Sequence, residues 1–112
     1  MIAARLINVP GVSSVLKNGF VTYSDQEKHK MLGVKNSTLA KYTAVSAEVC
    51  REMAIASGVS SKADVIVSVT GYAGPTYEGE AEVGLVYIGC NVKGNVTVEE
   101  FRFEGDRKTI RD

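Results

Sequence analysis

The sequence predicts an α/β fold in which a mixed β-sheet is flanked by helices within a single domain. Three observations support this prediction. The chain has 112 residues, which suits one hydrophobic core. Helical and strand-like apolar patterns alternate in the part before residue 70. Two more strand-like stretches follow close together near the end, as in a β-hairpin, so we expect a mixed sheet and not a purely parallel one.

Both ends of the chain read as interrupted helices. Residues 1–7 have helical spacing but start on an apolar residue without an N-cap. Residues 8–11, which contain proline and glycine, then end this helix. Residues 103–107 lead into a second helix, which starts at residues 108–112 and is cut off by the end of the sequence. We therefore expect a chain that is truncated at both ends.

Between these ends, the first half of the chain is predicted to be mostly helical. Residues 19–23 have the composition of a short strand, and residues 25–33 form a helix closed by Gly33. Residues 37–42 can add another short helix. Ser46 is a good N-cap for a helix that runs to about residue 58 or slightly beyond. One stripe of this helix comprises Val49, Cys50, Met53, Ala54 and Ser57.

The second half of the chain is predicted to supply the strands. Residues 64–69 are a β-branched run that we expect to be a buried strand. Residues 70–75 break it with glycine and proline, and a polar stretch continues to residue 82. Residues 83–92 and 96–103 read as two strands joined by a hairpin turn at residues 93–95.

The composition excludes several classes of protein. Thirteen basic residues balance thirteen acidic ones, so neither nucleic acid nor an anionic membrane is expected as a partner. No apolar run approaches the ~20 residues of a membrane helix. Cys50 and Cys90 lack the spacing of a metal site or a disulfide framework, and we expect buried free thiols in a reducing cytoplasm. No metal and no cofactor are expected.

Residues 22–30, TYSDQEKHK, gather ionisable side chains where a predicted strand meets a helix. Ser24 and Glu27 match a capping box, and this structural motif explains both residues without a catalytic role. This match places Tyr23 and Lys28 at the two positions that meet in a hydrophobic staple. Lys28 would lie at the positive end of the helix dipole, which disfavours its charged form, as partial burial also would. Lys28 is therefore a candidate base of a serine-lysine hydrolase, and the alternative is a solvated helix lysine.

Three turns carry further candidates. Ser13 follows a Pro-Gly pair and is a candidate nucleophile, or else an ordinary turn residue. Residues 70–75, TGYAGP, follow the most apolar strand, at the end where α/β sheets bind ligands, although glycines often simply mark turns. Asp106 can cap a helix, and Arg107 beside it can bind a phosphate or carboxylate, the alternative being a surface salt bridge.

Taken in order, these motifs resemble the C-terminal domain of the CinA (competence/damage-inducible) family, over nearly all 112 residues. The similarity includes "VPG" with a following serine, and GFVTYSDQEKHKMLGV against the family's G-x-V-x-Y-S-N-x-x-K-x-x-x-L-G-V. It also includes "AVS" at 44–46, "VTGYAGP" at 69–75 and "FEGDR" at 103–107. The tyrosine-serine-to-lysine block and the T-G-x-A-G-P block together make the resemblance specific.

The resemblance implies that residues 1–112 are a CinA C-terminal domain without its first strand and turn and without its last helix. Family members act as nicotinamide-nucleotide amidases, which hydrolyse the carboxamide of nicotinamide mononucleotide to nicotinate mononucleotide and ammonia. Matching positions imply that Ser13 is the nucleophile, Lys28 the base and Tyr23 its phenolic neighbour. The implied substrate-binding residues are Thr70, Gly71, Ala73, Gly74 and Arg107.

Several departures from the family pattern leave a second hypothesis open. The family's A-E-S-[CL]-T-G-G turn, whose serine lies in the active site, would precede Met1 and is absent from this sequence. Val12 replaces the first serine of P-G-S-S, Thr43 replaces a glycine, and the loop at 76–82 is one residue shorter. The chain can instead be a non-catalytic nucleotide-binding or interaction domain, within a protein linked to competence and DNA damage. Under either hypothesis we expect a homo-oligomer, because unpaired strands seek a neighbour.

Overall fold

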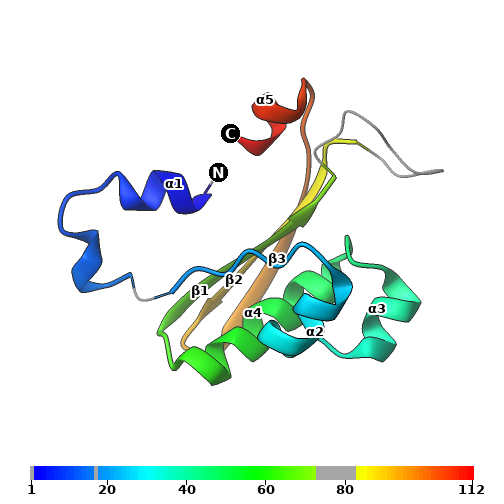
Figure 1. Ribbon diagram of the computed structural model, residues 1–112, viewed down its shortest axis with the longest axis horizontal. Helices are drawn as coiled ribbons and strands as arrows, with labels where there is room; N and C mark the ends of the chain where they lie inside the picture. Colours follow the sequence, from blue (N-terminus) through cyan, green and yellow to red (C-terminus); the bar gives the residue numbers. More distant parts are fainter. Residues whose placement is uncertain (1, 17, 73–82) are drawn as a thin grey trace.

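A three-stranded antiparallel sheet with strand order β1-β2-β3 forms the centre of the fold (Figure 1). The structure, a computed structural model, describes residues 2–16, 18–72 and 83–112, and the side chains of these residues outside 57–61. The strands are β1 (Val65–Gly71), β2 (Leu85–Val92) and β3 (Asn95–Arg102). The predicted α/β class is confirmed, and every strand pair in the described residues is antiparallel.

The predicted hairpin is confirmed between β2 and β3. Val92 pairs with Asn95, so the turn consists of Lys93 and Gly94 alone and is one residue shorter than predicted. Both turn residues have positive φ angles, 50° at Lys93 and 92° at Gly94. A two-residue turn with this backbone matches the twist of the strands that it joins. The Asn91 side chain accepts a hydrogen bond of 2.8 Å from the Gly94 N–H and closes the turn.

The strand predicted at residues 19–23 is not formed. These residues precede helix α2 without entering the sheet, and none of the described strands pairs with them. The prediction was wrong because strand composition produces a strand only where a neighbouring strand offers hydrogen bonds. The mixed sheet inferred from the sequence depended on such early strands, and the described sheet therefore lacks a parallel pair.

The predicted helices are confirmed with small changes at their ends. The structure contains α1 (Ile2–Ile7), the 3₁₀ turn η1 (Val12–Ser14), α2 (Asp25–Leu32), α3 (Asn36–Tyr42), α4 (Ala47–Ser61) and α5 (Arg107–Arg111). Gly33 closes α2 in the left-handed conformation, and Ser46 caps α4 by accepting a hydrogen bond of 3.2 Å from the Val49 N–H. Helix α4 ends at Ser61, slightly beyond residue 58, in agreement with the prediction.

Helix α4 lies between the sheet and helices α2 and α3 and organises the core. On the sheet side, the Cys50 sulfur lies 3.3 Å from the Ser68 hydroxyl of β1, and Asn91 of β2 donates to the Ala54 carbonyl. On its other side, α4 contacts α2 and α3 (Figure 1). These helices and the segment between them form one hydrophobic cluster with α4, made of Leu32, Val34, Leu39, Val49 and Met53.

The face of the sheet opposite α4 is largely uncovered in the described residues. Val65, Val67 and Val69 alternate with the residues that face α4, and all three are exposed, Val65 by 58%. The prediction of a fully buried β1 was therefore wrong on this face. Of the two free cysteines, Cys50 is buried as predicted, while Cys90 is only partly buried.

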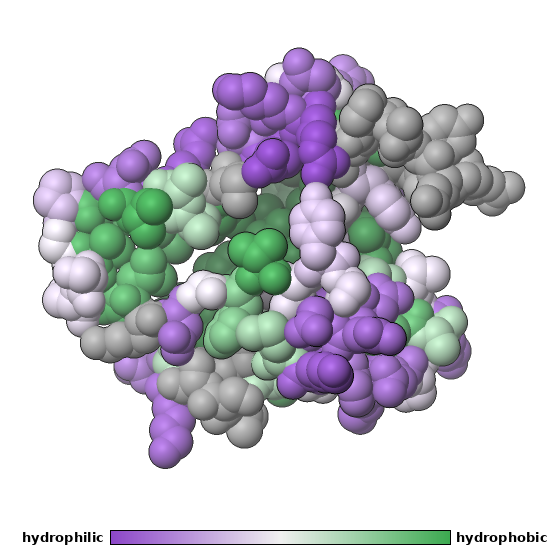
Figure 2. Space-filling view, in the orientation of Figure 1, coloured by the Kyte–Doolittle hydropathy of each residue, from purple (hydrophilic) through white to green (hydrophobic). Residues whose placement is uncertain are grey.

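Residues 2–16, which we call the N-terminal arm, extend away from the helical layer (Figure 1). The arm consists of α1 and η1, which contact each other, and no side chain of α1 is buried. A hydrogen bond of 3.2 Å from the Arg5 guanidinium to the Asp112 carbonyl connects the arm to the other end of the chain. Apolar side chains of the arm lie at the surface on the left of Figure 2.

Candidate functional site

The start of α2 has the geometry that the sequence predicted. Ser24 is extended, with φ −118° and ψ 159°, and its hydroxyl accepts a hydrogen bond of 3.2 Å from the Glu27 N–H. This hydrogen bond satisfies one of the free backbone donors of the first helical turn. Ser24 thus has a structural role, and it fixes the point from which the Lys28 side chain leaves the helix.

Lys28 is buried, with only 9% of its surface exposed. Its amine donates a hydrogen bond of 3.0 Å to the Thr22 carbonyl, and no described carboxylate pairs with it. Lysine is rarely buried without an ionic partner, because removing its charge from water is costly. The interpretation of Lys28 as a solvated helix lysine is therefore wrong. The neighbouring Lys30, by contrast, is exposed.

Tyr23, five residues before this lysine, contacts Arg107. The Arg107 guanidinium donates a hydrogen bond of 2.9 Å to the Tyr23 hydroxyl, and Tyr23 is 83% exposed. The Lys28 amine binds the carbonyl of the peptide group that joins Thr22 to Tyr23, so the two contacts are connected through the backbone before α2. The pairing predicted between Tyr23 and Lys28 is not formed by a hydrogen bond, because the phenol accepts from Arg107 and the amine donates to the Thr22 carbonyl.

Arg107 is held in place by the predicted cap of α5. The Asp106 carboxylate accepts a hydrogen bond of 2.8 Å from the Thr109 N–H. This hydrogen bond is the main cause that lowers the pKa of Asp106 below its ordinary value. The carboxylate is therefore ionised at neutral pH and keeps the first residue of α5 next to Tyr23.

Thr70 and Gly71 lie within β1 and not in a turn after it, which corrects the sequence prediction. The Thr70 hydroxyl is buried and donates a hydrogen bond of 2.7 Å to the Ala44 carbonyl. A Cβ atom at Gly71 would lie 2.8 Å from a methyl group of Val86 and 2.9 Å from the Leu85 carbonyl. The hydrogen bond of Thr70 and the close packing at Gly71 thus give both residues a structural role. Ala73 and Gly74 lie outside the described residues.

Ser13 lies in η1 of the N-terminal arm and is exposed. Gly11 precedes η1 with a φ of 83°, and the Ser14 hydroxyl donates to the Gly11 carbonyl. The Ser13 hydroxyl has no hydrogen-bond partner among the described residues. Figure 1 shows η1 and α2 on opposite sides of the molecule. One copy of the chain therefore does not bring Ser13 to Lys28.

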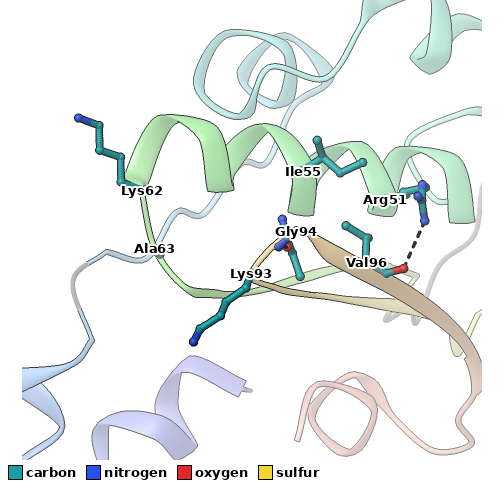
Figure 3. Close-up of a pocket in the computed structure, with 8 residues that line it drawn as sticks. Arg51, Ile55, Lys62, Ala63, Lys93, Gly94 and Val96 are labelled. Carbon is teal, nitrogen blue, oxygen red and sulfur yellow. Dashed lines mark hydrogen bonds between the residues drawn. The ribbon is translucent and has the colours of Figure 1, made fainter.

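A cavity of about 420 Å³ lies elsewhere, between α4 and the hairpin turn (Figure 3). Lys62 and Lys93 point in different directions around it, and Arg51 donates a hydrogen bond to the Val96 carbonyl. Its cationic groups do not converge on one point, so this cavity has no arrangement for binding an anion. Among the described residues, no group of three or more His, Cys, Asp or Glu side chains could hold a metal ion.

The sequence alone did not predict two contacts of the site. The contact between Tyr23 and Arg107 spans 84 positions, and nothing local to either residue indicates the other. The Thr22 carbonyl is a backbone group, which carries no sequence signal. The burial of Lys28 had one available signal, its position one helical turn after the N-cap, where side chains turn back over the entering chain.

The model of the CinA C-terminal domain family matches residues 1–112. The chain belongs to this family. CinA relatives include a protein of Clostridium beijerinckii that is 51% identical over 99% of this chain and is provisionally named a competence-damage inducible protein. A relative from Caldicellulosiruptor saccharolyticus with the same name is 48% identical over 100% of this chain. The chain spans 27% and 28% of the length of these two relatives.

Solved CinA structures share the fold. The competence/damage inducible protein CihA of Agrobacterium tumefaciens aligns with a TM-score of 0.92 and 40% identity, over 98% of this chain and 68% of that one. A CinA superfamily protein of Escherichia coli aligns with a TM-score of 0.90 and 34% identity, over 97% of this chain and 64% of that one. No helix in the described part of the CinA chain is long and apolar enough to cross a membrane.

Proposed function

We propose that this CinA domain belongs to an amidase that hydrolyses the carboxamide of nicotinamide mononucleotide, with Lys28 as the general base. The observation that carries the proposal is the burial of the Lys28 amine beside a single carbonyl, without a carboxylate partner among the described residues. An amine in such surroundings can exchange a proton with a substrate group without first breaking an ion pair. Membership of the CinA family supports the choice of substrate class.

In the proposed reaction, a serine hydroxyl attacks the carboxamide carbon while the Lys28 amine takes the hydroxyl proton. We assign this hydroxyl to Ser13. Lys28 then returns the proton to the leaving nitrogen, the carbon–nitrogen bond breaks and ammonia departs. Water attacks the resulting ester, its proton passes to Lys28, and the nicotinate carboxylate leaves as the serine is restored. No oxidant, reductant or further reactant is needed.

Arg107 and Tyr23 have complementary roles in this proposal. Arg107 presents N–H groups that can bind the phosphate of the nucleotide, because a guanidinium offers donors in a planar array that matches phosphate oxygens. Tyr23 orients this guanidinium through the hydrogen bond between them. Its exposed phenol can also orient the proton that Lys28 transfers. Thr70 is given no catalytic step, because its hydroxyl proton is bound to the Ala44 carbonyl.

The test is ammonia release from nicotinamide mononucleotide by the purified protein. We expect Lys28→Met to lower kcat/KM by about 10²- to 10⁴-fold, the usual contribution of a general base. Methionine keeps an apolar stem of similar length, so thermal unfolding should confirm that the variant folds. Lys30→Met is the matched control on the exposed side of the same helix and should retain activity. An inactive wild-type protein, or an active Lys28→Met variant, would refute the proposal.

A second candidate function is nucleotide binding without turnover. It is favoured by one observation, the separation of Ser13 from Lys28 within one copy of the chain. Under this hypothesis, calorimetry would detect binding of nicotinamide mononucleotide to a protein that releases no ammonia. Steady release of ammonia would exclude it.

A further inference from the structure

We infer that the site binds the carboxylate product of the proposed reaction more tightly than its carboxamide substrate, because Lys28 is buried without a carboxylate partner among the described residues. The inference rests on the proposed function and adds a form of regulation to it, since nicotinate mononucleotide then inhibits the enzyme that forms it. One side chain serves twice: Lys28 is the base during the reaction and the binding partner of the product afterwards.

The first argument is the number of hydrogen-bond donors on Lys28. A protonated lysine side chain has three N–H donors and no acceptor. One donor binds the Thr22 carbonyl at 3.0 Å, and the described residues offer the amine no other partner. Only 9% of the lysine surface is exposed, so water has little access to the remaining donors. A protonated Lys28 therefore has two donors that a ligand can use.

The second argument is the counter-charge of Lys28. The first turn of α2 carries two carboxylates, Asp25 and Glu27, but neither forms a salt bridge with the Lys28 amine. A buried ammonium group without a paired anion is costly, and a carboxylate on the ligand removes much of this cost. A carboxamide is neutral and cannot do so. Hydrogen bonds between two charged groups are also stronger than those between neutral groups.

The third argument is the proton balance of the last step of the reaction. Of the two protons of the attacking water, one restores the serine hydroxyl and the other begins on the product as a carboxylic acid. A carboxylic acid is far more acidic than an ammonium group. Its O–H bond therefore breaks as an N–H bond forms on the neutral Lys28 amine. The product complex then holds a carboxylate beside an ammonium group, whereas the substrate complex holds a neutral amide beside a neutral amine.

The size of the preference follows from this difference in charge. A hydrogen bond to a charged partner is roughly twice as strong as one between neutral groups, which corresponds to about tenfold in the dissociation constant. The two nucleotides share their ribose and phosphate, so the phosphate contact proposed for Arg107 contributes equally to both. The ratio of the two dissociation constants thus reports on the carboxyl end of the ligand alone.

Calorimetry with the two nucleotides tests the preference. Ser13→Ala should bind both without turnover, so their dissociation constants can be compared in one protein. We expect nicotinate mononucleotide to bind about tenfold more tightly than nicotinamide mononucleotide, and the added substitution Lys28→Met to abolish this difference. Lys30→Met in the same background is the matched control on the exposed side of α2 and should keep it. Equal binding of the two nucleotides, no binding of the carboxylate, or a preference that persists without Lys28 would overturn the inference.

A second measurement needs no variant. Nicotinate mononucleotide should inhibit ammonia release by the wild-type protein competitively, with an inhibition constant about tenfold below the KM for nicotinamide mononucleotide. An inhibition constant at or above this KM would overturn the inference and leave the amidase proposal intact. Lys28-dependent binding of the carboxylate to a protein that releases no ammonia would instead refute the amidase function alone. Ammonia release by Ser13→Ala would refute only the assignment of the nucleophile, and the inhibition constant would then decide the inference.

Discussion

The Arg107 guanidinium donates a 2.9 Å hydrogen bond to the Tyr23 hydroxyl and thereby joins the last helix of the chain to the entry of α2. Neither residue lies in the hydrophobic core, and both contact solvent. An exposed contact of this kind contributes little to folding stability. Its consequence is positional, because it holds a cationic donor array at Tyr23, whose peptide group with Thr22 accepts the hydrogen bond of the buried Lys28.

Replacing Arg107 should weaken substrate binding more than chemistry. Hydrogen bonds to charged groups contribute about 1.5–3 kcal/mol, so Arg107→Ala should raise KM for nicotinamide mononucleotide by about 10- to 100-fold, with a smaller change in kcat. Nicotinamide riboside, which lacks the phosphate, should be hydrolysed equally by wild type and variant. Arg102→Ala on β3 is the control. An unchanged KM would show that Arg107 does not bind the phosphate.

Gly89 should not tolerate a side chain. A Cβ atom there would lie 2.5 Å from the Ser68 hydroxyl and 3.1 Å from the Cys50 sulfur, where α4 packs closely on β2. Gly89→Ala should therefore lower the free energy of unfolding by about 1–3 kcal/mol, as measured by urea denaturation. Gly19→Ala is the matched control, since its Cβ would meet nothing within 4 Å and its φ is not positive. Equal stabilities of the two variants would contradict the packing described here.

Cys50 should make stability decline at alkaline pH. Burial is the main cause that raises the pKa of the Cys50 thiol above 9.0, and the Ser68 hydrogen bond offsets part of this effect. The unfolded chain therefore loses this proton first, so the thiol's contribution is complete below about pH 9 and is lost as the pH rises through its higher folded-state pKa. The free energy of unfolding should fall there in wild type and in Cys90→Ala. Cys50→Ala should show a shallower decline, and an identical decline would refute the assignment.

The hairpin turn offers a stabilising change. Lys93 adopts a φ of 50°, a conformation that costs most residues energy but suits asparagine. Lys93→Asn creates the Asn-Gly pair preferred in such turns and should raise the free energy of unfolding by about 0.5–1 kcal/mol. Lys93→Val, which is β-branched, should lower it. Thermal unfolding of both variants beside wild type provides the measurement, and a destabilised Lys93→Asn would show that the turn is of another type.

The sequence predicted the local structure well where the signal was local. Ser24, Gly33, Ser46 and Asp106 each mark a helix end through their own side chain or backbone, and the structure has a helix end at each. The hairpin was predicted for the same reason, because a glycine turn between two apolar runs specifies its own pairing. Such features need no information from distant parts of the chain.

The prediction failed where the outcome depends on distant residues. A strand at 19–23 needed a neighbour that the described sheet does not provide. Full burial of β1 needed a second layer, yet Val65 faces outward. The same limit applies to the site. The residue types Lys28, Tyr23 and Arg107 were identified from motifs, but their mutual arrangement required the folded chain.

Helix α4 contacts all three strands as well as α2 and α3, whereas α1 contacts η1 and, through Arg5, the Asp112 carbonyl. Amide hydrogens should therefore exchange with deuterium in two separate groups. Those of α4 and the strands should exchange only when the whole unit opens, because α4 is the helix on which the described strands pack. Those of the arm should exchange rapidly, because no side chain of α1 is buried and little packing holds the arm against the rest of the molecule.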